Sequence, residues 1–284
     1  MTNNNPVALV TGASSGIGEA AAIKLAAAGY TVYGTSRMGA GAGERTFPLL
    51  RLDVTDDTSV EAAVSELLQR EGRIDLLVNN AGFGIAPASA LESSIDQAKA
   101  LFDTNFLGIV RLIHAVVPHM RQQGSGQIIN ISSILGVVPM PYVALYAASK
   151  HAVEGYSEAL DHELRTDGIR VSLIEPAYTK TQFEANNIQP DARLAEFDLL
   201  RQKLAGVVTQ AMATADEPDV VAETILEAVR AKRPKLRYTA GKAAAQLQFL
   251  RRFAPASVLD SGIRKNLKLE TKTPERIVFA GLRP

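Results

Sequence analysis

The chain has 284 residues, no cysteine, and equal numbers of basic and acidic residues, so its formal net charge is zero. The missing cysteines exclude disulfides, thiol catalysis and thiolate metal sites, and the neutral balance gives no electrostatic reason to expect nucleic acid as a partner. With 46% hydrophobic residues, the chain has enough apolar material for one large α/β domain or two small ones.

The ends and the histidines suggest no membrane segment and no metal. Met1–Asn5 lacks the charged and apolar regions of a signal peptide, and no run reaches the about 18 apolar residues that cross a bilayer. We therefore expect a cytoplasmic protein without an integral membrane segment. His114, His119, His151 and His162 have no metal-ligand spacing, so no metal site is predicted, and helix-surface positions are expected for them.

The predicted elements alternate between strands and helices. Val7–Val10 is a β-prone run, and after a glycine-rich turn an Ala-rich helical pattern covers Glu19–Ala28 and ends at Gly29. Further strand-like runs follow at Tyr30–Thr35, Phe47–Leu52, Ile74–Val78, Gln127–Ile131, Val171–Ile174 and Lys235–Thr239. This alternation predicts a doubly wound α/β fold, a parallel sheet of about seven strands with helices on both faces. Gly39–Gly43 is expected to form a surface turn.

The last third of the chain has a different pattern. Pro218 is expected to open a helix that runs to about Ala231. Residues 242–269 have a helical pattern that combines apolar Leu247, Phe249, Leu250 and Phe253 with basic Arg251, Arg252, Arg264, Lys265 and Lys268. Such a helix can lie on a membrane, or it can pack on the core with its cations at the surface, and we favour packing. We treat residues 1–284 as one domain with a C-terminal helical extension at 242–284.

The turn at Thr11–Gly18 joins a strand to a helix and contains Gly12, Gly16 and Gly18. Strand, glycine-rich turn and helix form the first unit of a dinucleotide-binding fold, in which the glycines let the backbone approach a pyrophosphate and the helix N-terminus faces its charge. The spacing differs from the common G-x-G-x-x-G pattern. Glycines also serve tight strand-to-helix joints, so the turn alone does not establish a nucleotide site.

Tyr146 and Lys150 are four residues apart, and Ser133 lies thirteen positions before the tyrosine. On a helix this spacing places the phenol and the ammonium on one face, where the positive charge lowers the tyrosine pKa from its reference of about 10. A pair of this kind can move protons near neutral pH. Because any amphipathic helix can contain the same spacing by chance, the pair gains weight only beside the other motifs.

In this combination and order the motifs resemble the short-chain dehydrogenase/reductase family. The family's T-G-x-x-x-G-x-G turn corresponds to Thr11–Gly18, its N-N-A-G segment to Asn79–Gly82, and its active-site Asn, Ser, Tyr and Lys to Asn105, Ser133, Tyr146 and Lys150. The resemblance covers Val7–Thr181 by motif and the remainder by general layout. It implies an oxidoreductase similar to NADP-dependent carbonyl reductases and hydroxysteroid dehydrogenases.

The resemblance also implies a role for each catalytic residue. Tyr146 gives a proton in reduction or takes one in alcohol oxidation, while Lys150 lowers its pKa and hydrogen-bonds the nicotinamide ribose. Ser133 holds the substrate oxygen; Ser132 is a rival, but the thirteen-residue interval to the tyrosine matches Ser133. Asn105 anchors a water in the proton relay. The residues expected at the cofactor are Gly12, Ser14, Ser15, Gly16, Ile17, Gly18, Ser36, Arg37, Asp53, Val54, Asn80, Ala81, Gly82, Tyr146, Lys150, Pro176, Thr179 and Thr181.

The end of the second predicted strand favours NADP over NAD. An NAD enzyme usually has an acidic residue there, whereas this chain has Ser36 followed by Arg37, whose guanidinium suits a 2′-phosphate unless it only points to solvent. Asp53 corresponds to the family residue that accepts a hydrogen bond from the adenine, and Asp56 is the better helix cap. Where the family has Pro-Gly, this chain departs from the pattern with Pro176-Ala177, and the resemblance implies that Pro176, Thr179 and Thr181 still contact the nicotinamide end.

Substrate and assembly are predicted from apolar residues. Residues 178–212 correspond to the family's substrate lid, although a plain helical connection is an alternative. The apolar set Leu135, Val137, Val138, Met140, Tyr142 and Phe183, with Phe197 as a further member, predicts a lipophilic ketone, aldehyde or secondary alcohol of ketosteroid, retinoid or fatty carbonyl type. We also expect a homodimer or homotetramer joined through the helices that begin near Asn105 and Tyr146, which carry Leu107, Ile109, Val110, Leu112, Ala152, Val153 and Leu160.

Two other functions share parts of this pattern. A sugar-nucleotide epimerase or dehydratase also uses Tyr-x-x-x-Lys, typically with another glycine spacing and a larger C-terminal domain. A redox-sensing NADP-binding protein would keep the fold without turnover, and its usual mark is a broken catalytic set, whereas this set is intact.

Overall fold

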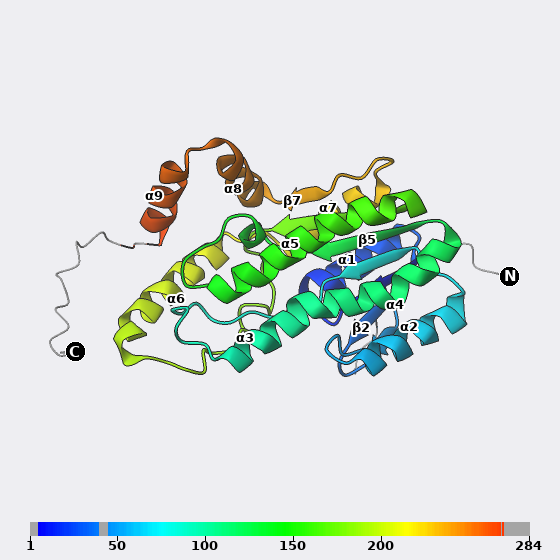
Figure 1. The fold of residues 1–284 in the computed structure, drawn as a ribbon, viewed down its shortest axis with the longest axis horizontal. Coiled ribbons are helices and arrows are strands. Elements are labelled where there is room, and N and C mark those ends of the chain that lie inside the picture. Colours follow the sequence, from blue (N-terminus) through cyan, green and yellow to red (C-terminus); the bar gives the residue numbers. More distant parts are fainter. Residues whose placement is uncertain (1–4, 40–44, 268, 270–284) are drawn as a thin grey trace, which may run out of the picture.

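The computed structural model describes residues 5–39, 45–267 and 269. Its seven parallel strands follow the order β3-β2-β1-β4-β5-β6-β7 (Figure 1), which confirms the predicted doubly wound α/β fold. The strands are β1 (Val7–Val10), β2 (Thr31–Ser36), β3 (Leu49–Arg51), β4 (Leu76–Asn79), β5 (Gly126–Ile131), β6 (Ile169–Pro176) and β7 (Arg237–Ala240). The direction of strand addition reverses between β1 and β4, and open α/β sheets bind their ligands at such a point.

Helices cover both faces of the sheet (Figure 1). Buried residues of α2, α4 and α5 form one apolar core with one face, and those of α1 and α7 form a second core with the other face. The α-helices are α1 (Gly16–Ala27), α2 (Asp57–Glu71), α3 (Ile95–Phe102), α4 (Gly108–Gln123), α5 (Ala144–Leu164), α6 (Asp198–Ala213), α7 (Pro218–Arg230), α8 (Lys242–Phe253) and α9 (Ala256–Asn266). Short helical turns are η1 (Asp103–Leu107), η2 (Ile134–Gly136), η3 (Arg165–Asp167) and η4 (Ala195–Phe197).

Local sequence signals set several of these boundaries. Asp56 caps α2 by accepting hydrogen bonds from the backbone N–H groups of Thr58 at 2.9 Å and Ser59 at 3.3 Å, so the expectation for this cap is confirmed. Pro218 opens α7, which ends at Arg230, close to the predicted end. The strand predicted at Phe47–Leu52 is shorter, because only Leu49–Arg51 pairs with β2. Most of the Gly39–Gly43 turn and Met1–Asn4 lie outside the described residues.

One helical stretch, Ile95–Gln123, has the length and mean hydropathy of a membrane span. It runs through α3, η1 and α4, and Leu101, Leu112 and Val116 on its inner side are fully buried in the core. The same length and hydropathy are found in core helices, and this stretch occupies a core position.

The C-terminal extension is helical in its described part, as predicted. Helices α8 and α9 stand at one edge of the molecule, beyond β7 (Figure 1). Residue 268 and residues 270–284 of the predicted extension lie outside the described residues.

Candidate active site

The glycine-rich turn lies at the carboxyl end of β1 and is closed by contacts with the segment after β4. Gly16 has a φ of +59°, which favours glycine. A side-chain carbon at Gly18 would lie 2.4 Å from the carbonyl oxygen of Gly12 and 2.5 Å from Asn80 Nδ2. This tight packing allows no larger residue at that point.

Thr11 and Asn80 hold the turn in place. The Thr11 hydroxyl accepts hydrogen bonds from the backbone N–H groups of Asn80 at 2.9 Å and Ala81 at 3.0 Å. In return Asn80 Nδ2 donates to the carbonyl oxygens of Thr11 at 2.9 Å and Gly12 at 3.1 Å. The two sequence motifs therefore form one rigid unit at the switch point of the sheet.

The start of α1 has the features of an anion site. Its N-cap, Ser15, makes no capping bond with its side chain, and the helix N-terminus faces the turn. A cavity of about 560 Å³ opens here, lined by the N-cap Ser15, by Gly16 and Glu19 of α1, by Lys180 and Thr181 after β6, and by further residues of α1, α6 and α7. The Glu19 carboxylate is paired with Arg45. Backbone N–H groups at a helix start next to glycines suit a pyrophosphate, so the residues present fit a dinucleotide.

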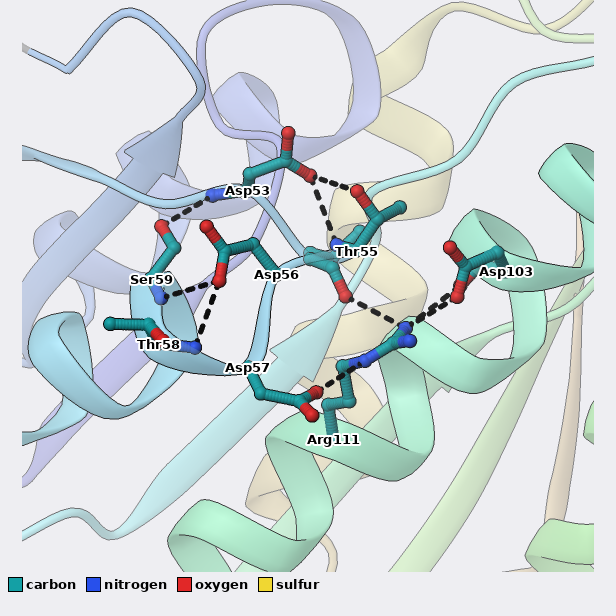
Figure 2. Close-up of polar contacts among 9 residues, drawn as sticks. Asp53, Thr55, Asp56, Asp57, Thr58, Ser59, Asp103 and Arg111 are labelled. Atoms are coloured by element: carbon teal, nitrogen blue, oxygen red, sulfur yellow. Dashed lines mark hydrogen bonds and ion pairs between the residues drawn. The ribbon is translucent and has the colours of Figure 1, made fainter.

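Asp53 lies where the adenosine end is expected. Its carboxylate accepts hydrogen bonds from the backbone N–H and the hydroxyl of Thr55 at 2.9 and 2.8 Å (Figure 2). These two bonds, with a smaller contribution from the charge of Arg37, lower the pKa of Asp53. Asp53 is thus charged and is not the helix cap. Arg37 is exposed, and the Ser36 hydroxyl donates to the carbonyl oxygen of Gly39 at 3.0 Å.

Two arginines brace this region, and no sequence pattern pointed to either. Arg111 of α4 contacts Asp57 at 2.6 Å, Asp103 at 2.7 Å and the carbonyl oxygen of Val54 at 3.3 Å, which ties α4 to the loop after β3 (Figure 2). Arg45 donates to the carbonyl oxygen of Ser14 at 3.2 Å and pairs with Glu19 of α1. The Arg45 guanidinium therefore lies beside the glycine turn.

Asn105 lies in the π-helical turn η1, between α3 and α4, and is almost fully buried. Its side chain accepts from the N–H of Phe83 at 3.0 Å and donates to the carbonyl oxygen of Phe83 at 2.9 Å. It also approaches Ser149 Oγ at 3.4 Å. The turn is a bulge in a longer helix, a feature often found at functional sites, and it points the amide toward α5.

Ser133 follows β5, and its hydroxyl accepts a hydrogen bond from the N–H of Leu135 at 3.1 Å. It also interacts with the Tyr146 hydroxyl. Ser132 is also buried, and its hydroxyl has no partner among the described residues. The contact with Tyr146 supports Ser133 over its neighbour.

Tyr146 and Lys150 lie on one face of α5, as the spacing predicted, but their pKa values differ from expectation. Burial raises the pKa of Tyr146; Ser133 lowers it and the charge of Glu184 raises it. Lys150 Nζ lies 5.7 Å from the tyrosine ring centre and donates to the carbonyl oxygen of Ile131 at 2.8 Å. The predicted lowering of the tyrosine pKa is therefore wrong for the chain alone, because burial is the largest influence on it and only Ser133 lowers it.

Burial also affects the lysine. It lowers the pKa of the Lys150 ammonium to about 8, and the charge of Glu154, one helical turn further on, opposes that shift. At neutral pH the ammonium is therefore still charged.

A cluster of two buried glutamates and an arginine, which the sequence did not indicate, begins one helical turn after Lys150. Glu154 of α5 and Glu175 of β6 are buried, and Arg237 of β7 lies 2.9 Å from Glu154 and 3.5 Å from Glu175. Gln248 of α8 donates to Glu175 at 2.8 Å. Burial and then the charge of Glu154 raise the pKa of Glu175 to about 7, while Arg237 and Gln248 act in the opposite direction.

The segment after β6 reaches both the turn and the tyrosine. A side-chain carbon at Gly16 would lie 3.2 Å from Thr181, which places Thr181 at the glycine turn. Thr179 is held by a 3.2 Å bond to the carbonyl oxygen of Ala177. Phe183 packs edge-on against Tyr146, with ring centres 5.7 Å apart. The segment thus brings an aromatic ring to Tyr146.

The predicted apolar pocket is only partly available. Val138 is buried in the core, and Leu135 and Val137 pack in a cluster with Ala244 and Leu247 of α8. Met140, Tyr142 and Phe183 remain partly exposed. Tyr142 has a φ of +69°, rare for such a residue, and its carbonyl oxygen accepts from the N–H of Ala88 at 2.9 Å.

Some of the residues predicted at a subunit interface are buried inside the subunit, and others are exposed. Ile109, Leu112, Val153 and Leu160 are buried in the core of the subunit, because these helix faces pack on the sheet. Leu107, Val110 and Ala152 remain at least partly exposed.

The described residues contain no group of three or more His, Cys, Asp or Glu side chains that could hold a metal ion. His114 and His119 lie on α4, and His151 and His162 lie on α5, each at least partly exposed.

Comparison with known proteins gives one family. The family described as short chain dehydrogenase matches residues 6–192. A 3-ketodihydrosphingosine reductase of Bacteroides thetaiotaomicron is 44% identical over 180 residues, which are 63% of this chain and 66%, just under two thirds, of that protein. Mouse 17-beta-hydroxysteroid dehydrogenase type 1 is 36% identical over 254 residues, 82% of this chain and 72% of that protein.

Solved structures agree. A short-chain dehydrogenase from Streptomyces avermitilis superposes with a TM-score of 0.77 and 29% identity, over 94% of this chain and 99% of that chain. A short-chain dehydrogenase/reductase from Burkholderia phymatum in complex with NAD has a TM-score of 0.74 and 27% identity, over 89% and 95%. The protein ElxO with NADP bound has a TM-score of 0.70 and 25% identity, over 85% and 99%.

Proposed function

Because the chain belongs to the short-chain dehydrogenase/reductase family and is an oxidoreductase of that type, we propose that it transfers a hydride between NADP(H) and a lipophilic ketone, aldehyde or secondary alcohol. The observation that carries this proposal is that Tyr146 lies close to both Ser133 and Lys150, while Asn105 contacts Ser149 of the same helix, α5. The bound nicotinamide supplies or accepts the hydride, so the chain must orient the carbonyl and move a proton.

Each side chain has a definite task in this scheme. The Tyr146 hydroxyl, next to Ser133 Oγ, donates its proton to the carbonyl oxygen as the alcohol forms, and it takes the proton back in oxidation. Ser133 holds that oxygen and stabilises the charge that develops on it. Lys150, still charged at neutral pH, stabilises the phenolate left behind. Asn105 is fixed by both of its bonds to Phe83, which suits a residue that anchors a water in a proton relay.

The residues proposed to hold the cofactor run from the glycine turn to the segment after β6. Gly12, Gly16, Gly18 and the start of α1 fit the pyrophosphate, and Asp53 fits the adenine amino group. Thr179 and Thr181, in the segment that follows β6, are proposed for the nicotinamide end. The other cofactor residues given in the sequence analysis are likewise proposed from the family motifs.

Arg37 supports NADP over NAD, since no carboxylate follows β2 at the place where it would repel a 2′-phosphate. One charge-assisted phosphate contact supplies at least about a tenfold preference for NADPH. We expect Arg37→Ala to lose that preference in cofactor titrations. Arg121→Ala, on α4 and paired with Asp167 instead, is the matched control and should keep it. Equal affinities of the wild-type protein for the two cofactors would refute this choice.

A lipophilic substrate is supported by Phe183, which packs on Tyr146, and by the partly exposed Met140 and Tyr142 in the loop before α5. Glu184 is the polar exception; burial raises the pKa of its carboxyl, and a hydrogen bond from Asn187 opposes that shift. We propose that residues 178–212 form the lid over this substrate. The test is a panel of carbonyl compounds with NADPH: kcat/KM should rise with the apolar length of the carbonyl, and values that stay flat or fall would contradict it.

Assembly and location are also proposals. We propose a homodimer or homotetramer that uses the exposed parts of α4 and α5, such as Leu107, and a cytoplasmic location.

A further inference from the structure

The helix pair α8–α9 has an inner face that is packed and an outer face that is not. On the inner face, Ala244 and Leu247 of α8 and Ile263 of α9 form a cluster with Ile134 and Val138. Ile134 and Val138 belong to the loop that follows the catalytic Ser133. This side confirms the packing that we expected for the extension, and it places the pair directly beside the active-site loop.

The outer face exposes large apolar side chains. The exposed fractions are 61% for Phe249, 42% for Leu250, 64% for Phe253 and 56% for Val258. The rings of Phe249 and Phe253 contact each other in a tilted arrangement, with centres 4.8 Å apart and an angle of 46° between the ring planes. Two phenylalanines one helical turn apart, held together and left in water, form an apolar ridge that no part of the described chain covers.

Cations surround this ridge. Arg251 and Arg252 are exposed beside it, and the Arg252 guanidinium lies 5.5 Å from the centre of the Phe253 ring. Residues 242–266 contain five basic residues and a single acidic one, Asp260, although the whole chain is neutral. Apolar rings flanked by arginines on a short amphipathic helix match the interface of an anionic bilayer: the rings enter the acyl boundary and the guanidinium groups meet the phosphates.

We propose that α8–α9 is a docking element that places the protein on the surface of an anionic phospholipid membrane. Phe249 and Phe253 insert into the interface, and Arg251 and Arg252 contact the lipid headgroups. Because the inner face of the same pair packs on the loop after Ser133, docking brings the catalytic edge close to the lipid phase. A lipophilic carbonyl dissolved in that phase would then reach the site without crossing water. The docking itself does not depend on the proposed catalysis.

The test measures binding of the full chain to lipid vesicles by co-sedimentation, with no substrate present. We expect binding to vesicles of equal parts phosphatidylcholine and phosphatidylserine, weak binding to phosphatidylcholine alone, and release as salt is raised, because screening weakens attraction to the headgroups. The double variant Arg251→Gln/Arg252→Gln should bind the anionic vesicles about thirtyfold more weakly, since each cation near an anionic surface contributes about 1 kcal/mol. The variant Phe249→Ser/Phe253→Ser should lose binding.

Matched controls change equally exposed residues elsewhere. Leu91→Ser/Ile95→Ser removes two apolar side chains that are 70% and 72% exposed near α3, and Lys99→Gln removes an exposed cation of the same helix. Both should bind like wild type. Each variant is checked for an unchanged melting temperature, to show that it is folded. The salt dependence of vesicle binding by the wild-type protein tests the role of the cations without any substitution.

Three results would overturn the proposal. They are absence of binding to anionic vesicles, equal binding to phosphatidylcholine alone, and unchanged binding of the Phe249→Ser/Phe253→Ser variant. If that variant loses no lipid binding but light scattering shows a smaller oligomer, the ridge is an interface between copies of the chain. The vesicle assay uses no substrate, so its result does not depend on whether the protein reduces a carbonyl compound. Failure of the proposed reductase activity and failure of membrane docking are therefore distinguished.

Discussion

Glu175 should make the stability of this protein fall as pH rises, which is opposite to the usual behaviour of a carboxylate. Its side chain is fully buried at the end of β6, next to Glu154, and these surroundings raise its pKa from 4.5 to about 7. The folded state therefore keeps a proton that the unfolded state loses. The stabilisation is complete below pH 4.5 and is lost as the pH rises through 7.

The size of the effect follows from the same two pKa values. Between pH 5 and pH 8 the linkage relation gives a loss of about 2.5 kcal/mol in the free energy of unfolding from this group alone. For a chain of this length that corresponds to a shift of about 4 °C in melting temperature. The variant Glu175→Gln keeps the shape and has no proton to lose, so it should not show this loss.

The assay is urea unfolding of both proteins at several pH values from 5 to 8. The difference between variant and wild type cancels the other titrating groups, and it should move by about 2.5 kcal/mol in favour of the variant as the pH rises. Glu158→Gln is the control, because Arg237 lowers the pKa of the largely exposed Glu158 and its titration lies below this window. A difference that stays constant from pH 5 to 8 would show that Glu175 is ionised throughout.

Further outcomes concern the site and the scaffold. Tyr146→Phe should lower turnover by at least about 10²-fold while cofactor titrations still show binding, because the ring stays and the proton is gone; a rate above about a tenth of wild type would remove this residue from the proton transfer. Since the charge of Glu184 raises the pKa of Tyr146, Glu184→Gln should move the pH profile of kcat/KM for alcohol oxidation to lower pH, and a shift to higher pH would contradict the assignment. Asp161→Ala should reduce the free energy of unfolding in urea by about 3–5 kcal/mol, because it leaves Arg170 and the N–H of Val171 without their buried carboxylate; a loss under about 1 kcal/mol would be the contrary result. Light scattering at micromolar concentration should give at least a dimer, whereas a monomeric mass would refute the proposed assembly.

The sequence alone predicted the parts of this protein that depend on short-range patterns. Alternation of β-prone and helical runs predicted the doubly wound sheet, because a parallel strand buried on both faces needs an apolar run and a crossover helix. The spacing between Tyr146 and Lys150 predicted one helix face, and the glycine turn predicted a tight joint, since both features follow from local backbone geometry. Strand ends were placed only to within a few residues, because pairing with a neighbour, as at β3, decides them.

The tertiary structure decided how strongly each group is buried and what lies across from it. The pattern of Tyr146 and Lys150 predicted a lowered tyrosine pKa, yet burial and Glu184, from a segment far along the chain, raise it. Glu154, Glu175 and Arg237 come from three separate elements, so no local motif could reveal their cluster. On α8, the apolar residues that pack against the loop after Ser133 are covered, whereas Phe249 and Phe253 are exposed. Desolvation and contact both depend on neighbours distant in sequence, and only the folded chain brings those neighbours together.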